Sequence, residues 1–329
     1  MILVTGGAGF IGSNIVAALD DIGEEVSVCD RLRSNDKWRN LAKRSLRAFV
    51  SPDSLPEFLE RSPPASIDAI VHMGAISSTT ENDGDLVIQN NFELSRYLWE
   101  WCSEHNTRFI YASSAATYGD GSNGFLDDWT DAELQKLRPL NLYGWSKQLF
   151  DRYVAQSIEH RKCAPPQFAG LKFFNVYGPN EYHKGSMKSV VAHLFPRISS
   201  GSPAELFRSY HPDYPHGGQL RDFVYVRDCV EAVLWLLNNP SVSGIFNIGS
   251  GQARTFSDLA RATMRAAGRS PEIEFIDMPI SLRSKYQYYT QADISGLRKH
   301  GYTRVPTPLE EGVEDYVTGY LMNEIDIYR

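Results

Sequence analysis

Tyr143 and Lys147 are the residues whose types and spacing most directly suggest chemistry. They lie four positions apart in the stretch Leu-Asn-Leu-Tyr-Gly-Trp-Ser-Lys, and on a helix such side chains share one face. A free phenol, with a pKa of about 10, is a poor base at neutral pH, but a nearby ammonium favours the phenolate. Ser114, earlier in a Ser-rich stretch, could hydrogen-bond the reacting hydroxyl or carbonyl. Alone, so short a pattern is more often a helix cap with a solvated lysine.

A glycine-rich turn near the N-terminus changes that balance. An apolar run ends at Thr5, and Gly6, Gly9 and Gly12 precede a helical stretch at 13–20. Glycine permits a tight turn and close approach to a pyrophosphate, while the helix N-terminus supplies amides and a positive dipole. A second strand-like run at 25–30 ends in Asp30, where a ribose-binding acid is expected. The combination predicts a dinucleotide site.

Strand-like and helix-like runs alternate along the chain, which predicts an α/β fold with a doubly wound parallel sheet. We expect strands at 68–72, 108–112 and 167–174, a helix at 86–102 and a surface insertion at 128–137. The strand at 108–112 would deliver Ser113 and Ser114 to the carboxyl edge of the sheet, where ligands bind.

Beyond Asn175 the pattern changes. The stretch 199–219 is too irregular for a strand or helix, while the runs at 223–226 and 244–248 are interpreted as strands that return to the main sheet. We therefore expect a dinucleotide-binding domain at 1–175, with 222–249 returning to it, and a smaller, discontinuous α/β substrate-binding lobe formed by 176–221 and 250–329.

Composition excludes several classes of function. The net charge of −7, without a long basic run, argues against nucleic acid as a partner. The four scattered cysteines favour a reducing, cytoplasmic compartment, and a strand that starts at the N-terminus leaves no room for a signal peptide. No apolar stretch is long enough to cross a membrane, and the histidines lack metal-ligand spacing, so no metal is expected.

Several longer stretches carry a resemblance to a known family. They are 74–81, 111–119, 173–187, 221–226 and 286–293. Over nearly its whole length the chain resembles the extended short-chain dehydrogenase/reductase family of NAD-dependent epimerases and dehydratases, which implies a Rossmann-type fold. The stretches Ser-Ser-Thr-Thr-Glu at 77–81 and His-Lys-Gly-Ser at 183–186 are similar to those of the members that act on ADP-activated heptose. The resemblance implies an isomerase that inverts C6 of ADP-D-glycero-D-manno-heptose for lipopolysaccharide core synthesis.

The resemblance also assigns residues to this reaction. It implies that Ser114, Tyr143 and Lys147 carry out catalysis, with Lys184 as a second acid/base. Dehydratases have Thr-Asp-Glu where this chain has Ser114-Ala-Ala, so dehydration is disfavoured. The implied substrate-binding residues are Ser77, Ser114, Asn175, Ser186, His193, Phe207, Arg221 and Tyr286.

The implied cofactor is NADP, with NAD as the alternative. Asp30 suits the 2′-hydroxyl of NAD, whereas Arg31 and Lys37 could meet the 2′-phosphate of NADP. The implied cofactor-binding residues are Gly6, Gly9, Phe10, Ile11, Gly12, Asp30, Arg31, Lys37, Gly74, Ala75, Asn90, Lys147 and Val176. Two departures affect the adenine side: Met73 replaces an acidic residue common in the family, and 48–52 lacks an expected lysine.

Other functions stay open at this point. Another nucleotide-sugar epimerase, such as a UDP-hexose 4-epimerase, or a reductase would use the same residues. A non-catalytic cofactor-sensing regulator is a further alternative, although such a protein would not need the intact Ser114, Tyr143 and Lys147. The resemblance also implies a homo-oligomer, a pentamer.

Overall fold

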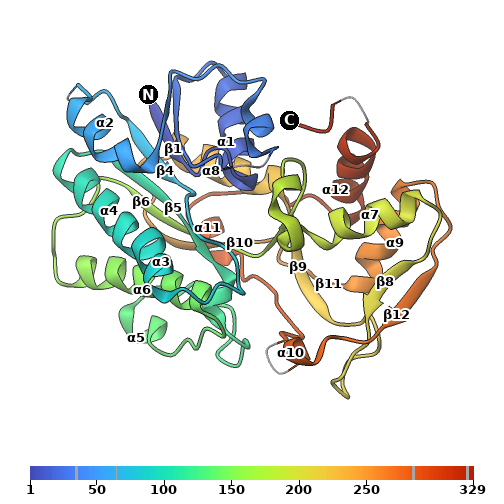
Figure 1. Ribbon diagram of the computed structural model, residues 1–329. Coiled ribbons are helices and arrows are strands. Elements are labelled where there is room, and N and C mark those ends of the chain that lie inside the picture. Colours follow the sequence, from blue (N-terminus) through green and yellow to red (C-terminus); the bar gives the residue numbers. More distant parts are fainter. Residues whose placement is uncertain (34–35, 64, 284–285, 324–325) are drawn as a thin grey trace.

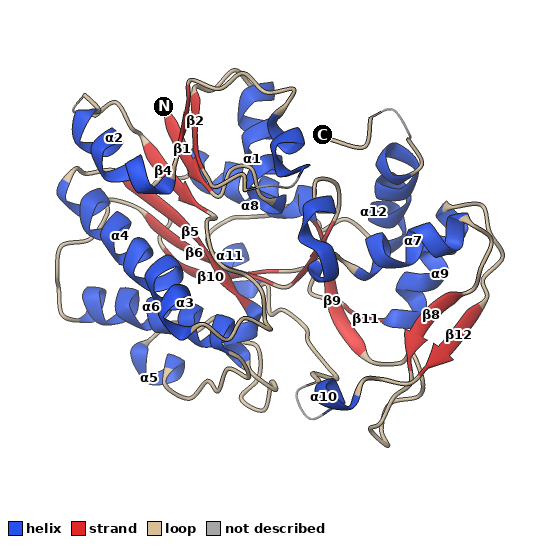
Figure 2. Ribbon diagram, in the orientation of Figure 1, coloured by secondary structure: helices blue, strands red, loops and turns tan. Residues whose placement is uncertain are grey.

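A seven-stranded parallel sheet forms the centre of the larger lobe (Figures 1 and 2). The computed structural model describes residues 1–33, 36–63, 65–283, 286–323 and 326–329. The strand order is β10-β6-β5-β4-β1-β2-β3. The strands are β1 (Ile2–Thr5), β2 (Val26–Cys29), β3 (Ala48–Val50), β4 (Ala69–His72), β5 (Arg108–Ser114), β6 (Phe168–Phe173) and β10 (Gly244–Ile248). β1, β2, β4, β6 and β10 are buried along their whole length, as expected of a parallel sheet covered on both faces.

Helices cover both faces of this sheet and confirm the doubly wound prediction. α1 (Phe10–Asp21) and α8 (Val226–Asn238) pack on the face that carries Val4, whereas α2 (Leu55–Arg61), α4 (Leu94–Glu104) and α6 (Leu142–Glu159) pack on the face that carries Leu3. The carboxyl ends of β1, β4 and β5 therefore open between the two helix layers, at the edge where open α/β sheets bind their ligands.

The helix expected at 86–102 is divided by a π-helical turn. α3 (Gly84–Ile88) and α4 are joined by π geometry at Gln89–Glu93. Such turns insert an extra residue and occur often at functional sites. This turn carries Asn90 and Asn91, of which Asn91 is buried.

The structure corrects three predictions, the first two of them in the smaller lobe. The run at 223–226 belongs to β9 (Leu220–Tyr225), which does not return to the main sheet: it pairs in parallel with β7 (Asn175–Tyr177) and antiparallel with β11 (Ala253–Thr255). Only the run at 244–248 returns, as β10. The irregular stretch 199–219 contains a strand, β8 (Ala204–Phe207), which pairs with β12 (Ile273–Ile276).

The third correction concerns 128–137. This segment contains α5 (Asp131–Leu134), and Leu134 is buried in the core that α1 and α8 share, so the segment is not merely a surface insertion.

The remaining helices are α7 (Val190–Ser199), α9 (Phe256–Ala266), α10 (Ile280–Arg283), α11 (Ser295–Lys299) and α12 (Leu309–Tyr316). Across the described part of the chain, no helix is both long and apolar enough to span a membrane. The domain boundaries stay a prediction.

Candidate active site

Tyr143, Lys147 and Ser114 converge where β5 meets α6. Asn141 caps α6, accepting a hydrogen bond from the Gly144 amide at 2.9 Å, which places Tyr143 in the first turn. Ser114 ends β5 and forms a side-chain hydrogen bond with Tyr143. The sequence pattern thus predicted the grouping correctly, although the catalytic roles themselves stay predictions.

Burial dominates the electrostatics of this group. Burial raises the pKa of Tyr143, the hydrogen bond with Ser114 lowers it, and the charge of Asp151 raises it. Lys147 is 3% exposed, and burial lowers its pKa to about 8 while Asp151 acts in the opposite direction. At neutral pH Lys147 remains mostly charged, so it can stabilise a phenolate on Tyr143.

A buried ion pair behind these residues was not predicted. Asp151 accepts hydrogen bonds from the Tyr111 hydroxyl at 3.0 Å and the Ser113 hydroxyl at 2.7 Å. Lys172 Nζ lies 3.1 Å from the same carboxylate and 4.7 Å from the centre of the Tyr118 ring. The position of Asp151, one helical turn beyond Lys147, was the available signal; nothing near Lys172 in the sequence indicates its partner.

The glycine-rich turn forms a cradle that side chains would fill. Gly6 has φ of +64°, and a Cβ there would lie 2.6 Å from the Gly74 nitrogen. A Cβ on Gly12 would lie 2.2 Å from the Gly6 carbonyl oxygen. α1 begins at Phe10 immediately after this turn, with Ile11 in its first turn and Gly9 as its N-cap. A dinucleotide pyrophosphate fits such a turn because the backbone can approach it closely and the helix amides face it.

Asp30 lies beside this turn with its carboxylate held by the protein. It accepts hydrogen bonds from the Ala8 amide at 2.9 Å and from Lys37 Nζ at 2.5 Å. Arg31 forms a bidentate pair with Asp53, at 3.0 and 2.8 Å. Both cations expected at a 2′-phosphate therefore already face carboxylates. Asp53 was not predicted.

The segment after β4 is fixed by Asn91 rather than by Asn90. Asn91 exchanges hydrogen bonds with both backbone groups of Ile76, at 2.8 and 2.9 Å, and donates to the Ser146 hydroxyl on α6 at 3.0 Å. Asn90 donates to the Leu86 carbonyl within its own helix. Gly74 and Ala75 precede this anchor at the carboxyl edge of the sheet, and Ser77, just beyond Ile76, is exposed.

Lys184 reaches the site from the smaller lobe. Its ammonium lies 5.3 Å from the centre of the Phe10 ring, at the glycine turn. Burial lowers its pKa, and the nearby Glu181 carboxylate raises it. In the same loop the Ser186 carbonyl contacts a His193 ring nitrogen at 3.1 Å, so two residues expected to bind substrate lie together.

Arg221 and Tyr286 also lie together. The Arg221 guanidinium is 5.2 Å from the Tyr286 ring and 5.7 Å from the Phe256 ring. It is 7% exposed and donates to the Leu220 and Gln287 carbonyls. Burial lowers the pKa of Arg221, and only tyrosines oppose this effect. A buried guanidinium without a carboxylate partner among the described residues suits a phosphate ligand.

The other residues expected to contact substrate or cofactor lie at strand ends. Asn175 and Val176 begin β7, and Phe207 ends β8. Asn175 is exposed and Val176 is half-buried. No hydrogen bond joins Phe207 to Arg221 within the described part of the chain, although Gln219 donates to the Phe207 carbonyl at 3.3 Å.

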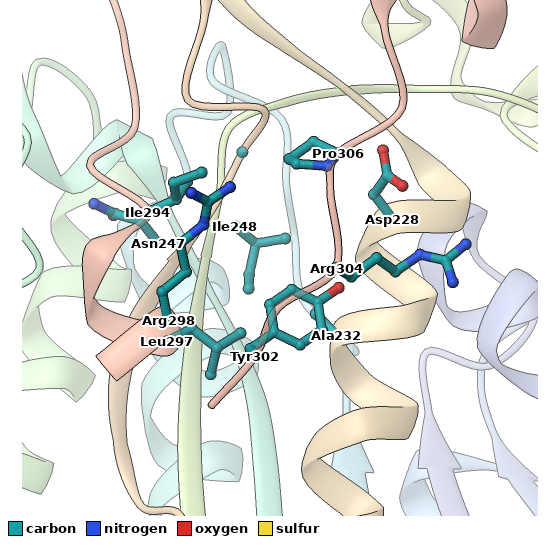
Figure 3. A pocket seen from close by; sticks show the side chains of 11 residues that line it. Asp228, Ala232, Asn247, Ile248, Ile294, Leu297, Arg298, Tyr302, Arg304 and Pro306 are labelled. Carbon is teal, nitrogen blue, oxygen red and sulfur yellow. The ribbon is translucent and has the colours of Figure 1, made fainter. Parts of the chain in front are cut away.

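A small cavity lies apart from these groups (Figure 3). It measures about 30 Å³ and is lined by Asp228, Ile248, Leu297 and Tyr302 among others, none of them a predicted site residue. That volume accommodates about one water molecule, so the cavity is not a nucleotide-sugar site. The described residues include no cluster of metal-binding side chains.

Known proteins share both sequence and fold with this chain. Residues 2–249 match the family described as the NAD dependent epimerase/dehydratase family. The chain belongs to this family. It is 52% identical over 323 residues to an ADP-L-glycero-D-manno-heptose-6-epimerase of Nitratidesulfovibrio vulgaris (strain DP4), covering 98% of each chain. It is 48% identical over 332 residues to the protein of the same name from Fusobacterium nucleatum, covering 98% of this chain and 99% of that one.

Two crystal structures extend the comparison. The Helicobacter pylori ADP-L-glycero-D-manno-heptose-6-epimerase superposes with a TM-score of 0.78 at 28% identity, covering 96% of this chain and 94% of that one. The Thermus thermophilus UDP-glucose 4-epimerase, a complex with NAD, superposes with a TM-score of 0.75 at 27% identity, covering 96% and 97%. Membership of this epimerase family confirms the predicted fold, enzyme class and nicotinamide cofactor.

Proposed function

We propose that this epimerase inverts C6 of ADP-D-glycero-D-manno-heptose by transient oxidation and re-reduction. The observation that carries the proposal is that Lys184, from the smaller lobe, lies over Phe10 at the glycine turn, while Tyr143 lies in the first turn of α6 next to the end of β5. Relatives 52% and 48% identical bear the corresponding name. The enzyme would supply activated heptose for lipopolysaccharide core.

An exocyclic centre explains why two such groups are useful. A nicotinamide cofactor held at the glycine turn would supply the chemistry of removing the hydride from C6 and giving it back. Inversion requires its return to the opposite face of the C6 carbonyl, which a rotation about one C–C bond achieves while the sugar ring stays in place. The oxygen then occupies two positions, and a single positioned base cannot serve both well.

The chain's own groups divide this work. Tyr143, with Lys147 stabilising its phenolate, takes or returns the hydroxyl proton at one position, and Ser114 donates a hydrogen bond to the same oxygen. Lys184 serves the other position. Arg221 would hold the diphosphate with a planar, bidentate donor, flanked by Tyr286 and Phe207. Ser77, Asn175, Ser186 and His193 would contact the sugar.

We further propose NADP as the cofactor, with Arg31 and Lys37 at its 2′-phosphate. Gly6, Gly9, Phe10, Ile11 and Gly12 would hold the pyrophosphate, Asp30 the ribose, and Gly74, Ala75, Asn90 and Val176 the nicotinamide half. Because the enzyme regains its own hydride, release between turnovers brings no benefit. The protein should purify with nicotinamide dinucleotide bound, identified by mass spectrometry after heat release; a flavin would contradict this.

A panel of nucleotide sugars tests the reaction. The purified protein would be incubated with ADP-D-glycero-D-manno-heptose, UDP-glucose and a dTDP-hexose, with products followed by NMR. The expected result is an equilibrium mixture of the two C6 epimers from the ADP-heptose alone. Conversion of UDP-glucose to UDP-galactose would support a 4-epimerase instead. Location in the cytoplasm and assembly into a pentamer stay predictions, the latter measurable by light scattering.

A further inference from the structure

Three buried asparagines join the glycine-rich turn to the loop that carries Lys184. They are Asn14 on α1, Asn40 in the turn at 36–41, and Asn180 between β7 and the Lys184 loop; each is at most 1% exposed. Asn14 donates to the Pro179 carbonyl at 3.0 Å, and Asn180 donates to the Ser13 hydroxyl at 3.0 Å. Asn180 adopts φ of +72°, a conformation that asparagine tolerates better than most residues.

Asn40 is the central member of this group. Its Nδ2 donates to the Ala8 carbonyl at 2.9 Å, within the glycine turn, and to the Asn180 carbonyl at 3.1 Å. The same nitrogen lies 3.3 Å from His183 Nδ1. The side-chain amide of Asn40 thus contacts both the glycine turn and His183, the residue before Lys184. These two segments are far apart in the sequence.

The charges around His183 come both from the cofactor turn and from its own loop. Burial, together with the charges of Lys37 and Lys184, lowers the pKa of His183 to about 4, and Asp30 opposes this effect. Asp30 and Lys37 are expected at the bound dinucleotide, and Lys184 is expected at the substrate.

We propose that Asn40 is a positioning residue that makes cofactor retention and the placement of Lys184 depend on one side chain. Asn40 holds the loop at 180–184 against the glycine turn. This loop also presents Lys184, so it must lift before the dinucleotide can leave. The enzyme would thereby form its second acid/base only on a closed cofactor site. The role assigned to Lys184 rests on the proposed function, whereas the contact itself does not.

Asn40→Ala tests this proposal, with Asn239→Ala as the matched control. Asn239 also donates its amide to a backbone carbonyl, that of Trp235 at 2.7 Å, but on α8. Two rates would be measured without any sugar substrate. One is cofactor release after dilution, followed by fluorescence of the reduced dinucleotide. The other is acetylation of Lys184 by acetic anhydride, measured by peptide mass spectrometry with the exposed Lys162 as an internal reference.

We expect Asn40→Ala to accelerate both release and Lys184 acetylation by about tenfold, the effect of losing two buried hydrogen bonds. Both rates in Asn239→Ala, and Lys162 acetylation in every variant, should stay unchanged. If either rate matches the wild-type protein, the proposal is wrong. Should Asn40→Ala fail to fold, the isosteric Asn40→Asp removes the same two donors and takes its place.

A double-mutant cycle checks the catalytic consequence. In the wild-type background Asn40→Ala should lower kcat about tenfold, and in the Lys184→Met background it should have little further effect, because residues that act through one group are not additive. Losses that multiply would show that Asn40 acts independently of Lys184 and would overturn the proposal. Failure of the proposed function would appear separately, as no turnover of ADP-heptose by the unmodified protein.

Discussion

The ammonium of Lys172 and the carboxylate of Asp151 lie 3.1 Å apart, with side chains that are 1% and 0% exposed. The pair connects β6 to the helix that carries Tyr143 and Lys147. Asp151 alone would add a negative charge beneath the phenol and oppose its ionisation. Lys172 balances this charge, so Asp151 opposes the ionisation of Tyr143 less than it would alone.

Removing Lys172 should therefore be costly. Lys172→Met leaves a buried carboxylate without its cation, and we expect the free energy of unfolding to fall by about 3–5 kcal/mol, measured by urea denaturation. Lys172→Arg should lose much less because it keeps the charge. The double variant Asp151→Asn/Lys172→Met removes both charges but keeps an acceptor for the Tyr111 and Ser113 hydroxyls, so it should recover most of the loss. The exposed Lys162→Met serves as control. A loss under about 1 kcal/mol for Lys172→Met would contradict the importance of the pair.

The sequence predicted those parts of the site whose residues lie close together in one segment, because their chemistry fixes the spacing between them. The glycine turn must leave space where a Cβ would collide, and Tyr143 and Lys147 must share a helix face; both requirements are visible as spacing. Asp151–Lys172 and Asn40–Asn180 join segments far apart in the chain, so no spacing rule reveals them. The same limit explains β9: its apolar run reads as a buried strand, but only packing decides which sheet it joins.

Tyr143→Phe should abolish epimerisation while leaving the fold intact. The ring keeps its packing, but the group that exchanges a proton is lost, so kcat should fall at least about hundredfold. Cofactor content and the melting temperature should match those of the wild-type protein. Measurable activity within a few-fold of wild type would assign the proton transfer to another group.

Lys184→Met should cause a comparable loss for a different reason. The aliphatic stem stays over Phe10, but the ammonium that serves the second oxygen position is gone. A C6 aldehyde analogue gives the sharper measurement, since its dismutation requires hydride transfer in both directions. Near-normal kcat with only a raised KM would show that Lys184 binds the substrate and that Tyr143 acts alone.

The pairing of Arg31 with Asp53 leads to a prediction about cofactor preference. Asp53→Asn removes a carboxylate that competes with a 2′-phosphate for Arg31, so affinity for NADP should rise about tenfold relative to NAD, as measured by titration of the apoprotein. Replacing Arg31 and Lys37 with Ala should weaken NADP more than NAD. Equal changes for both cofactors would remove these residues from phosphate recognition.

Lys147 provides a test that links stability to pH. Burial lowers its pKa from 10.5 to about 8 in the folded protein, so the folded state disfavours the charged ammonium. Below pH 8 both folded and unfolded chains carry the proton, and the full cost of roughly 3 kcal/mol applies. Between pH 8 and 10.5 the unfolded chain binds more protons, so the stability of the wild-type protein should rise with pH.

Lys147→Met removes the buried charge. The variant should be inactive. Its apoprotein should be more stable than the wild-type apoprotein at pH 7 by up to roughly 3 kcal/mol, and this difference should vanish above about pH 10.5. Urea denaturation at pH 7, 8, 9 and 10.5 measures this, with Lys162→Met as the exposed control. If the variant is less stable than wild type at pH 7, the Lys147 ammonium stabilises the fold. The prediction that its burial lowers the stability of the protein would then be wrong.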